Sequence, residues 1–179
     1  CKRSGFKAMC LTVDTVVAGN RERDHRWGFT TPPKLTLKSL LSFATHPMWS
    51  INYLTHEKFQ LANVSHFTKK GSSIAKGVME YINEQYDPKM NWADAEYCIK
   101  RWGGPFAIKG VMSVEDAKRA VDIGASAIML SNHGGRQLDG VNSSISTLPE
   151  IKKAVSNIEI LMDGGISSGQ DILKAIALG

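Results

Sequence analysis

The stretch FAIKGVMSVEDAKRAVDIGASAIML (residues 106–130) contains two short apolar segments separated by an amphipathic one. Phe106–Lys109 and Ala127–Leu130 have the length and apolar content of buried parallel strands. Ser113–Ile123 has helical spacing, with a capping Ser at its start and Gly124 at its end. This order predicts a strand–helix–strand unit with parallel strands.

The same alternation continues on both sides of this stretch. Downstream, the pattern predicts a helix over Thr147–Val155, with Pro149 near its first turn, a strand over Ile158–Met162 and a helix over Gly169–Leu178. Upstream, the apolar run Ala8–Val13 has the features of another buried strand. The chain is therefore expected to have an α/β fold with four parallel strands.

A long interval, Thr15–Pro105, separates the first two expected strands. Gly19–Asp24 is polar and is expected to be a loop. Helical spacing begins at Thr36 and runs to Phe43, and the His46-Pro47 pair interrupts it. A second helix is expected over Trp92–Trp102. Intervals of this length between strands are typical of inserted lids or functional loops.

Polar residues follow or end each expected strand: Asp14, Lys109, Ser131 to His133, and Asp163. Both an α/β barrel and a doubly wound sheet place ligands at this edge. The barrel is favoured because every strand contributes a polar group and no single switch point is evident. A complete barrel needs about 250 residues. We therefore expect residues 1–179 to form a single partial domain of a (β/α)8 TIM barrel, truncated at both ends. It would have about four consecutive βα units and a long inserted loop after the first strand.

Composition narrows the class of protein. The 179 residues include 22 Lys and Arg against 17 Asp and Glu, and 42% are hydrophobic, as in soluble globular proteins. The net charge of +5 suits an anionic substrate, a cofactor phosphate or a membrane surface. No compact basic run points to nucleic acid. Cys1, Cys10 and Cys98 lack metal-site spacing, so no metal site is expected, and they indicate a reducing compartment. No apolar stretch is long enough to span a membrane.

The segment Ser131–Arg136 (SNHGGR) is the strongest candidate for chemistry. His133 has the residue type of a general base near neutral pH, and Arg136 can pair with a carboxylate through two hydrogen bonds. The glycines allow a ligand to approach the backbone closely. The alternative is a polar loop with a surface His and Arg.

Three further groups have both functional and structural readings. Asp163, Gly164 and Gly165, with Ile166 and Ser167 before a helix, could hold a phosphate with backbone N–H groups, or could form an ordinary βα loop.

Lys109 at a strand tip could stabilise developing negative charge, or could be a solvated side chain. Asp14, near Thr12, could orient a catalytic His, or could be a turn residue. Arg21 could be a second carboxylate anchor, or a solvated charge among its charged neighbours.

The string SNHGGRQLD (residues 131–139) closely resembles the signature of the FMN-dependent 2-hydroxy-acid dehydrogenase and oxidase family. Further matching segments occur in the family's order: LTVDT (11–15), GNRERD (19–24), IKGV (108–111) and DGG (163–165). The resemblance covers nearly the whole chain. The FTTPPKL segment (29–35) and the helix after it look most like the bacterial L-lactate dehydrogenase branch.

The resemblance implies a role for each matching residue. His133 would be the base and Asp14 its partner. Arg136 would bind the substrate carboxylate, with Arg21 assisting. The FMN contacts would come from Thr12, Lys109, Ser131, Asp163, Gly164, Gly165, Ile166 and Ser167. Lys109 would lie near flavin N1 and O2, and the Asp163–Ser167 segment would line the ribityl-phosphate side. Many relatives have Arg where this chain has Ser167 or Ser168, so phosphate binding is expected to use other groups.

The implied function is FMN-dependent oxidation of an L-2-hydroxy acid, L-lactate to pyruvate. Other readings are another 2-hydroxy acid such as glycolate, a non-catalytic barrel fragment with unassembled sites, and a barrel isomerase or aldolase with Lys109 as a Schiff-base amine. The electron acceptor could be oxygen, a quinone or a cytochrome. The full-length protein is expected to be a homo-oligomer in the cytoplasm, associated peripherally with the inner face of a bacterial membrane, and not to bind nucleic acid.

Overall fold

The computed structural model describes residues 1–16, 19–26, 36–57, 81 and 84–179. These residues form two compact units. Unit 1 contains Cys1–Asn20 and Asp87–Gly179, and unit 2 contains Arg21–Tyr86. The FTTPPKL segment (29–35), which suggested a particular branch of the family, lies outside the described residues.

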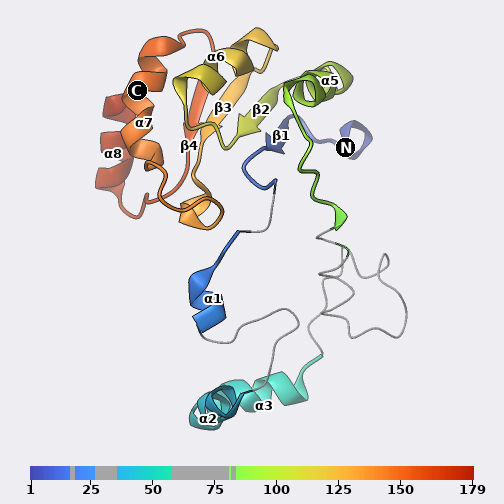
Figure 1. The fold of residues 1–179 in the computed structure, drawn as a ribbon, viewed down its shortest axis with the longest axis vertical. Helices are drawn as coiled ribbons and strands as arrows, with labels where there is room; N and C mark the ends of the chain where they lie inside the picture. Colours follow the sequence, from blue (N-terminus) through green and yellow to red (C-terminus); the bar gives the residue numbers. More distant parts are fainter. Residues whose placement is uncertain (17–18, 27–35, 58–80, 82–83) are drawn as a thin grey trace. The chain divides into compact units, whose positions relative to one another are not determined.

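Unit 1 is built on a four-stranded parallel sheet (Figure 1). Its strands are β1 (Met9–Thr12), β2 (Phe106–Lys109), β3 (Ala127–Leu130) and β4 (Glu159–Met162). β2 and β3 have the predicted bounds, and β1 and β4 differ from them by one residue at an end. A short 3-10 helix, η1 (Lys2–Ser4), precedes β1.

The strand order in the sheet is β1-β2-β3-β4, the same as the order in the chain. Every crossover therefore moves one strand further in the same direction. A doubly wound sheet reverses direction at a switch point, and no reversal occurs among the described strands. The order is that of consecutive βα units in a barrel wall, which agrees with the sequence-based choice of a barrel.

Four helices accompany the strands of unit 1: α5 (Trp92–Trp102), α6 (Val114–Asp122), α7 (Ser144–Ala154) and α8 (Gly169–Leu178). α5 and α8 have the predicted bounds, and both begin with a capping box. The prediction for α7 was wrong at its start. The helix begins at Ser144, three residues early, so Pro149 lies in its interior. The buried side chains of Leu148 and Ile151 hold this helix in place despite the proline.

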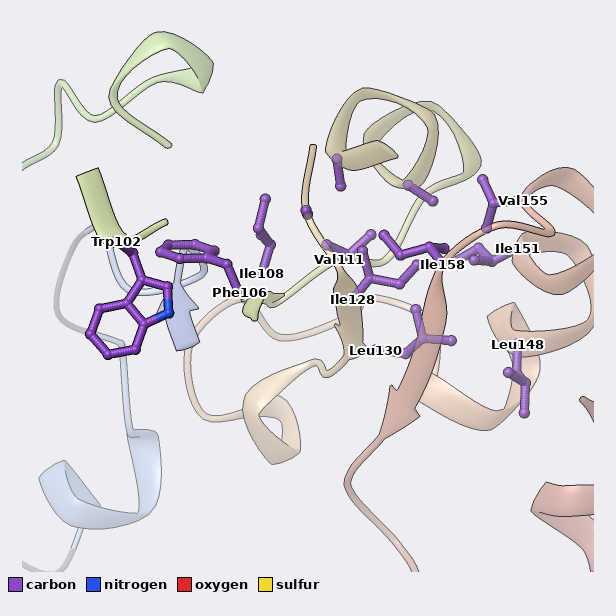
Figure 2. Packing of buried hydrophobic residues seen from close by; sticks show 13 residues of the cluster. Trp102, Phe106, Ile108, Val111, Ile128, Leu130, Leu148, Ile151, Val155 and Ile158 are labelled. Carbon is purple, nitrogen blue, oxygen red and sulfur yellow. The ribbon is translucent and has the colours of Figure 1, made fainter. Parts of the chain in front are cut away.

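The core lies between the sheet and these helices. Along β2, Phe106 and Ile108 are buried and Ala107 and Lys109 are only partly so, which is the period-two pattern of a strand with one face on the helices. Ile108 pairs with Ile128 of β3, and both are fully buried. Figure 2 shows these side chains packed with those from α7. Burying each large aliphatic side chain contributes about 1.5–3 kcal/mol.

Unit 2 contains three short helices, α1 (Glu22–Arg26), α2 (Leu37–Thr45) and α3 (Pro47–Thr55). The loop predicted over Gly19–Asp24 was wrong at its end, because Glu22 starts a helical turn and pairs with Arg26 at 2.7 Å. Thr36 caps α2, as its position suggested. The His46-Pro47 pair does end α2, but it also starts α3, where proline is favoured in the first turn.

Candidate functional site

The carboxyl ends of the four strands bring the predicted polar residues to one edge of the sheet. Thr12 and Lys109 end neighbouring strands and face each other in the register. Ser131 follows β3 and Asp163 follows β4. Parallel strands all end at the same edge, and for this reason residues distant in sequence meet here.

Lys109 lies at the centre of this group. Its Nζ donates a hydrogen bond of 2.6 Å to Oγ of Ser131 and lies 3.2 Å from Oδ2 of Asp163. The Lys109 side chain is 20% exposed, and Ser131 is fully buried. A buried ammonium needs such partners to offset its lost hydration. Partial burial raises the pKa of the Cys10 thiol on the adjacent strand, and the Lys109 charge lowers it.

His133 is paired with Asp14. Its Nδ1 lies 3.1 Å from Oδ1 and 3.2 Å from Oδ2 of the carboxylate. An ionised carboxylate only accepts hydrogen bonds, so the proton of the neutral ring is assigned to Nδ1. This leaves Nε2 with a free lone pair. The arrangement orients the imidazole as a base and would stabilise its protonated form.

Gly110 makes this pair possible. β2 lies between β1, which carries Asp14, and β3, which carries His133. The Asp14 side chain passes close to the end of β2, where a Cβ on Gly110 would lie only 2.9 Å from Cβ of Asp14. Gly110 also has φ +103. Sequence reasoning missed this role, although a glycine directly after a strand-tip lysine was a visible signal.

The loop after β3 holds His133 in an unusual backbone conformation. His133 has φ 56 and is the one non-glycine residue with positive φ in the described part of the chain. It opens a 3-10 turn, η3 (His133–Gly135). Its N–H donates to Oγ of Ser131 at 3.2 Å, and Asn132 accepts from the N–H of Gly134 at 3.0 Å. Left-handed conformations of this kind cost about 1–3 kcal/mol and persist where surrounding contacts impose them.

The two predicted carboxylate anchors differ in what can be said of them. Arg136 follows η3, is exposed, and forms no ion pair with any residue that the structure describes. Its guanidinium is thus available to an anion. Arg21 is exposed in unit 2, next to α1, and its role as a second anchor stays a prediction.

The predicted phosphate segment forms the turn between β4 and α8. Gly164 and Gly165 have φ 90 and 75. The carboxylate of Asp171 accepts from Oγ and N–H of both Ser167 and Ser168. The Ser168 hydroxyl and then the Ser167 N–H lower the Asp171 pKa, against a small opposing effect of desolvation. An incoming phosphate would find these groups already occupied and would rely on the glycine N–H groups.

A cavity of about 500 Å³ adjoins this turn. Its lining includes Gly164, Gly165 and Ile166 together with two groups that sequence reasoning did not single out, Ser144 and Lys174. The Ser144 hydroxyl is buried and has no hydrogen-bond partner among the described residues. A buried hydroxyl without a partner is uncommon, and no signal in the sequence identified it.

The donor set fits a flavin mononucleotide. Lys109 supplies a partly buried cation, and the hydroxyls of Thr12 and Ser131 lie on the strands on either side of it. A cation there suits the negative charge of a reduced flavin ring. Gly164 and Gly165 offer backbone N–H groups in the left-handed conformations that form anion-binding concavities.

Comparison with known proteins agrees with this geometry. The family model described as FMN-dependent dehydrogenase matches residues 1–179. An L-lactate dehydrogenase of Serratia proteamaculans is 41% identical over 99% of this chain and 47% of its own length. An L-lactate oxidase of Nostoc sp. is 42% identical over 98% of this chain and 43% of its own length. The chain thus spans a little under half the length of these relatives.

Solved structures agree on the fold. The monotopic membrane protein (S)-mandelate dehydrogenase matches with a TM-score of 0.88 and 35% identity, over 99% of this chain and 47% of that one. A lactate oxidase of Pediococcus acidilactici matches with a TM-score of 0.67 and 31% identity, over 99% and 40%. The four-stranded sheet and its helices correspond to part of the TIM barrel of such enzymes. The chain belongs to the FMN-dependent dehydrogenase family.

Proposed function

We propose that the protein containing this chain oxidises an L-2-hydroxy acid, with L-lactate converted to pyruvate. The observation that carries the proposal is the His133–Asp14 pair at the same sheet edge as the Lys109 ammonium. A base, a carboxylate anchor and a cation for the reduced cofactor are what this oxidation requires.

Arg136 would bind the substrate carboxylate. Its guanidinium can form two parallel hydrogen bonds with a carboxylate, which fixes orientation as well as position. No described residue competes for it through an ion pair. Holding the carboxylate would present the hydroxyl-bearing carbon to the base in a limited set of orientations. Arg21 would assist as a second anchor.

His133 would take up the substrate proton at Nε2. The Asp14 carboxylate accepts the hydrogen bond from Nδ1, which maintains this tautomer. As the ring gains a proton, its positive charge develops beside the negative charge of Asp14. The left-handed backbone at His133 and the Ser131 hydroxyl together fix the position of the ring's backbone.

Lys109, Thr12, Ser131 and the Asp163–Ser167 turn would hold the cofactor. Bound FMN supplies a two-electron acceptor for the oxidation. The ammonium of Lys109 would stabilise negative charge close to it. Asp163 keeps that ammonium in place through the 3.2 Å ion pair.

The visible flavin spectrum of the complete protein tests this proposal. We expect added FMN to bind and to bleach on anaerobic addition of L-lactate. Bound flavin that stays oxidised with every L-2-hydroxy acid would refute it. (S)-Mandelate should be tested beside L-lactate and glycolate, because the structural match with a TM-score of 0.88 is an (S)-mandelate dehydrogenase. Relative bleaching rates would then rank the substrates.

A second proposal concerns the chain of residues 1–179 taken alone. It spans about half the length of its relatives, and β1 and β4 are sheet edges within the described residues. In isolation the chain would be a non-catalytic fragment, and its open edges would promote association. A soluble monomer that binds FMN and bleaches with substrate would contradict this.

We also propose that the full-length protein is a homo-oligomer associated peripherally with the cytoplasmic face of a membrane, with oxygen, a quinone or a cytochrome as electron acceptor. The (S)-mandelate dehydrogenase that this chain resembles is described as a monotopic membrane protein, which supports the membrane association. Reoxidation of the bleached enzyme by each acceptor in turn would identify the one used.

A further inference from the structure

We propose that the two-helix segment Thr36–His56, called here the apolar hairpin, is the surface that docks the protein on a lipid bilayer and lies within the boundary between headgroups and acyl chains. This rests on the proposed peripheral membrane association and names the part of the chain responsible. The hairpin consists of α2 and α3, which contact each other within unit 2 (Figure 1).

The first observation is the amount of exposed apolar surface on the hairpin. Leu37 and Leu54 are 81% and 80% exposed. Six further large apolar side chains of the hairpin are also exposed: Leu40, Leu41, Met48, Trp49, Ile51 and Tyr53. Neither helix buries a single residue. Scattered exposed apolar residues are normal, but contiguous groups of this kind mark interaction sites.

The second observation is that the polar side chains of the hairpin bond to its own backbone. The hydroxyls of Ser39, Thr45, Ser50 and Thr55 donate to hairpin carbonyl oxygens at 2.8–2.9 Å. The Nδ1 atoms of His46 and His56 lie 2.8 and 2.9 Å from the carbonyl oxygens of Ser42 and Asn52. Polar groups satisfied in this way cost little to remove from water. A surface that normally faces water has no need of such pairing, whereas one that enters lipid does.

The third observation is charge. Residues 27–56 contain two lysines and two histidines but no Asp or Glu, although the chain has 17 acidic residues. A carboxylate in this segment would be repelled by anionic lipid headgroups and would be costly in the apolar region. Lysine and neutral or protonated histidine are compatible with both.

Length and aromatic content determine how the hairpin would lie. Each helix has nine residues, about 14 Å, far below the thickness of a bilayer core. In the part of the chain that the structure describes, no helix is long and apolar enough to cross a membrane. Trp49 stacks between Phe43 and Tyr53 with both centroid distances at 5.3 Å. Exposed Trp and Tyr favour the interfacial region, so the hairpin is expected to lie parallel to the membrane.

The test uses flotation of the complete protein with vesicles of phosphatidylcholine and phosphatidylglycerol. We expect the wild-type protein to float with the vesicles. The double variant L41D/L54D should bind at least about tenfold more weakly, because it places charges where apolar side chains enter lipid. The matched control Y97D changes an aromatic residue, 67% exposed on α5, and should float like the wild type.

A second readout tests depth directly. Brominated acyl chains should quench the fluorescence lost in the W49F variant, because Trp49 would lie at their level. Wild-type protein that stays in solution, or L41D/L54D that floats unchanged, would overturn the proposal. So would a wild-type oligomer that L41D/L54D converts to monomers without any vesicle binding, because the hairpin would then face a second copy. Bleaching by L-lactate, measured on the same samples, reports separately on the proposed oxidation.

Discussion

Replacing Asp14 with Asn would test whether the carboxylate beside His133 serves the proton transfer. Asn keeps the shape of the side chain and can still accept a hydrogen bond from Nδ1, which lies 3.1 Å away in the wild type. The substitution removes the negative charge. We therefore expect substrate binding to change little and the rate of flavin reduction to fall.

The size of the effect follows from the geometry. Two unit charges 3.1 Å apart interact by about 5 kcal/mol at an effective dielectric constant of about 20, and by about 1.3 kcal/mol in bulk water. The side chains of Asp14 and His133 are 16% and 35% exposed, which places the pair between these limits. A loss of about 3 kcal/mol from the transition state corresponds to a rate about a hundredfold lower.

The assay is anaerobic stopped-flow reduction of bound flavin by L-lactate in the complete enzyme. D122N is the matched control, because Asp122 is an exposed carboxylate on α6, and it should reduce flavin at the wild-type rate. Reduction of D14N within about twofold of the wild-type rate would refute the reasoning. Retention of bound FMN in D14N excludes loss of cofactor as the cause of slow reduction.

Three further predictions concern neighbouring parts of unit 1. G110A should lower the free energy of unfolding by about 2 kcal/mol or more, because its Cβ would meet Asp14; G140A, which also has positive φ but open space around it, should cost less, and urea unfolding of both variants compares them. R136K should raise KM for L-lactate about tenfold or more, since a lysine cannot form the double hydrogen bond; unchanged steady-state kinetics would remove Arg136 from substrate binding. Asp171 has a lowered pKa in the folded protein, so its stabilising contribution is complete above about pH 4 and is lost as pH falls through the folded value. D171N should therefore weaken the dependence of stability on pH in the acid range, which thermal unfolding between pH 3 and pH 6 would show.

The regular part of unit 1 was predictable because local and global signals agree there. Each strand is a four-residue apolar run at the end of a helix–turn segment, and each predicted cap forms the hydrogen bond expected of it at Ser113 and Ser168. The candidate site was predictable for a related reason. Parallel strands end at one edge, so the order of polar residues along the chain fixes which of them meet.

Other features depend on contacts that no local pattern contains. The early start of α7 depends on buried Leu148 and Ile151, which offset the interior Pro149. The role of Gly110 depends on a side chain from another strand passing beside it. Ser131 looked like a cofactor ligand, but its Oγ also accepts from Lys109 and from the N–H of His133. These are tertiary effects, and residue spacing does not reveal them.

The pairing of Asp14 with His133 has a consequence for how the protein becomes competent. The two residues are 119 positions apart, and closing a loop of that length costs roughly 4 kcal/mol of chain entropy. This cost is met only when β1 has joined β2 and β2 has joined β3, because Asp14 reaches His133 beside the end of the intervening strand. During refolding, a collapsed intermediate without β1 would contain an imidazole with no fixed tautomer. Recovery of activity should then follow the slowest strand-pairing event, and lag behind the recovery of helical structure.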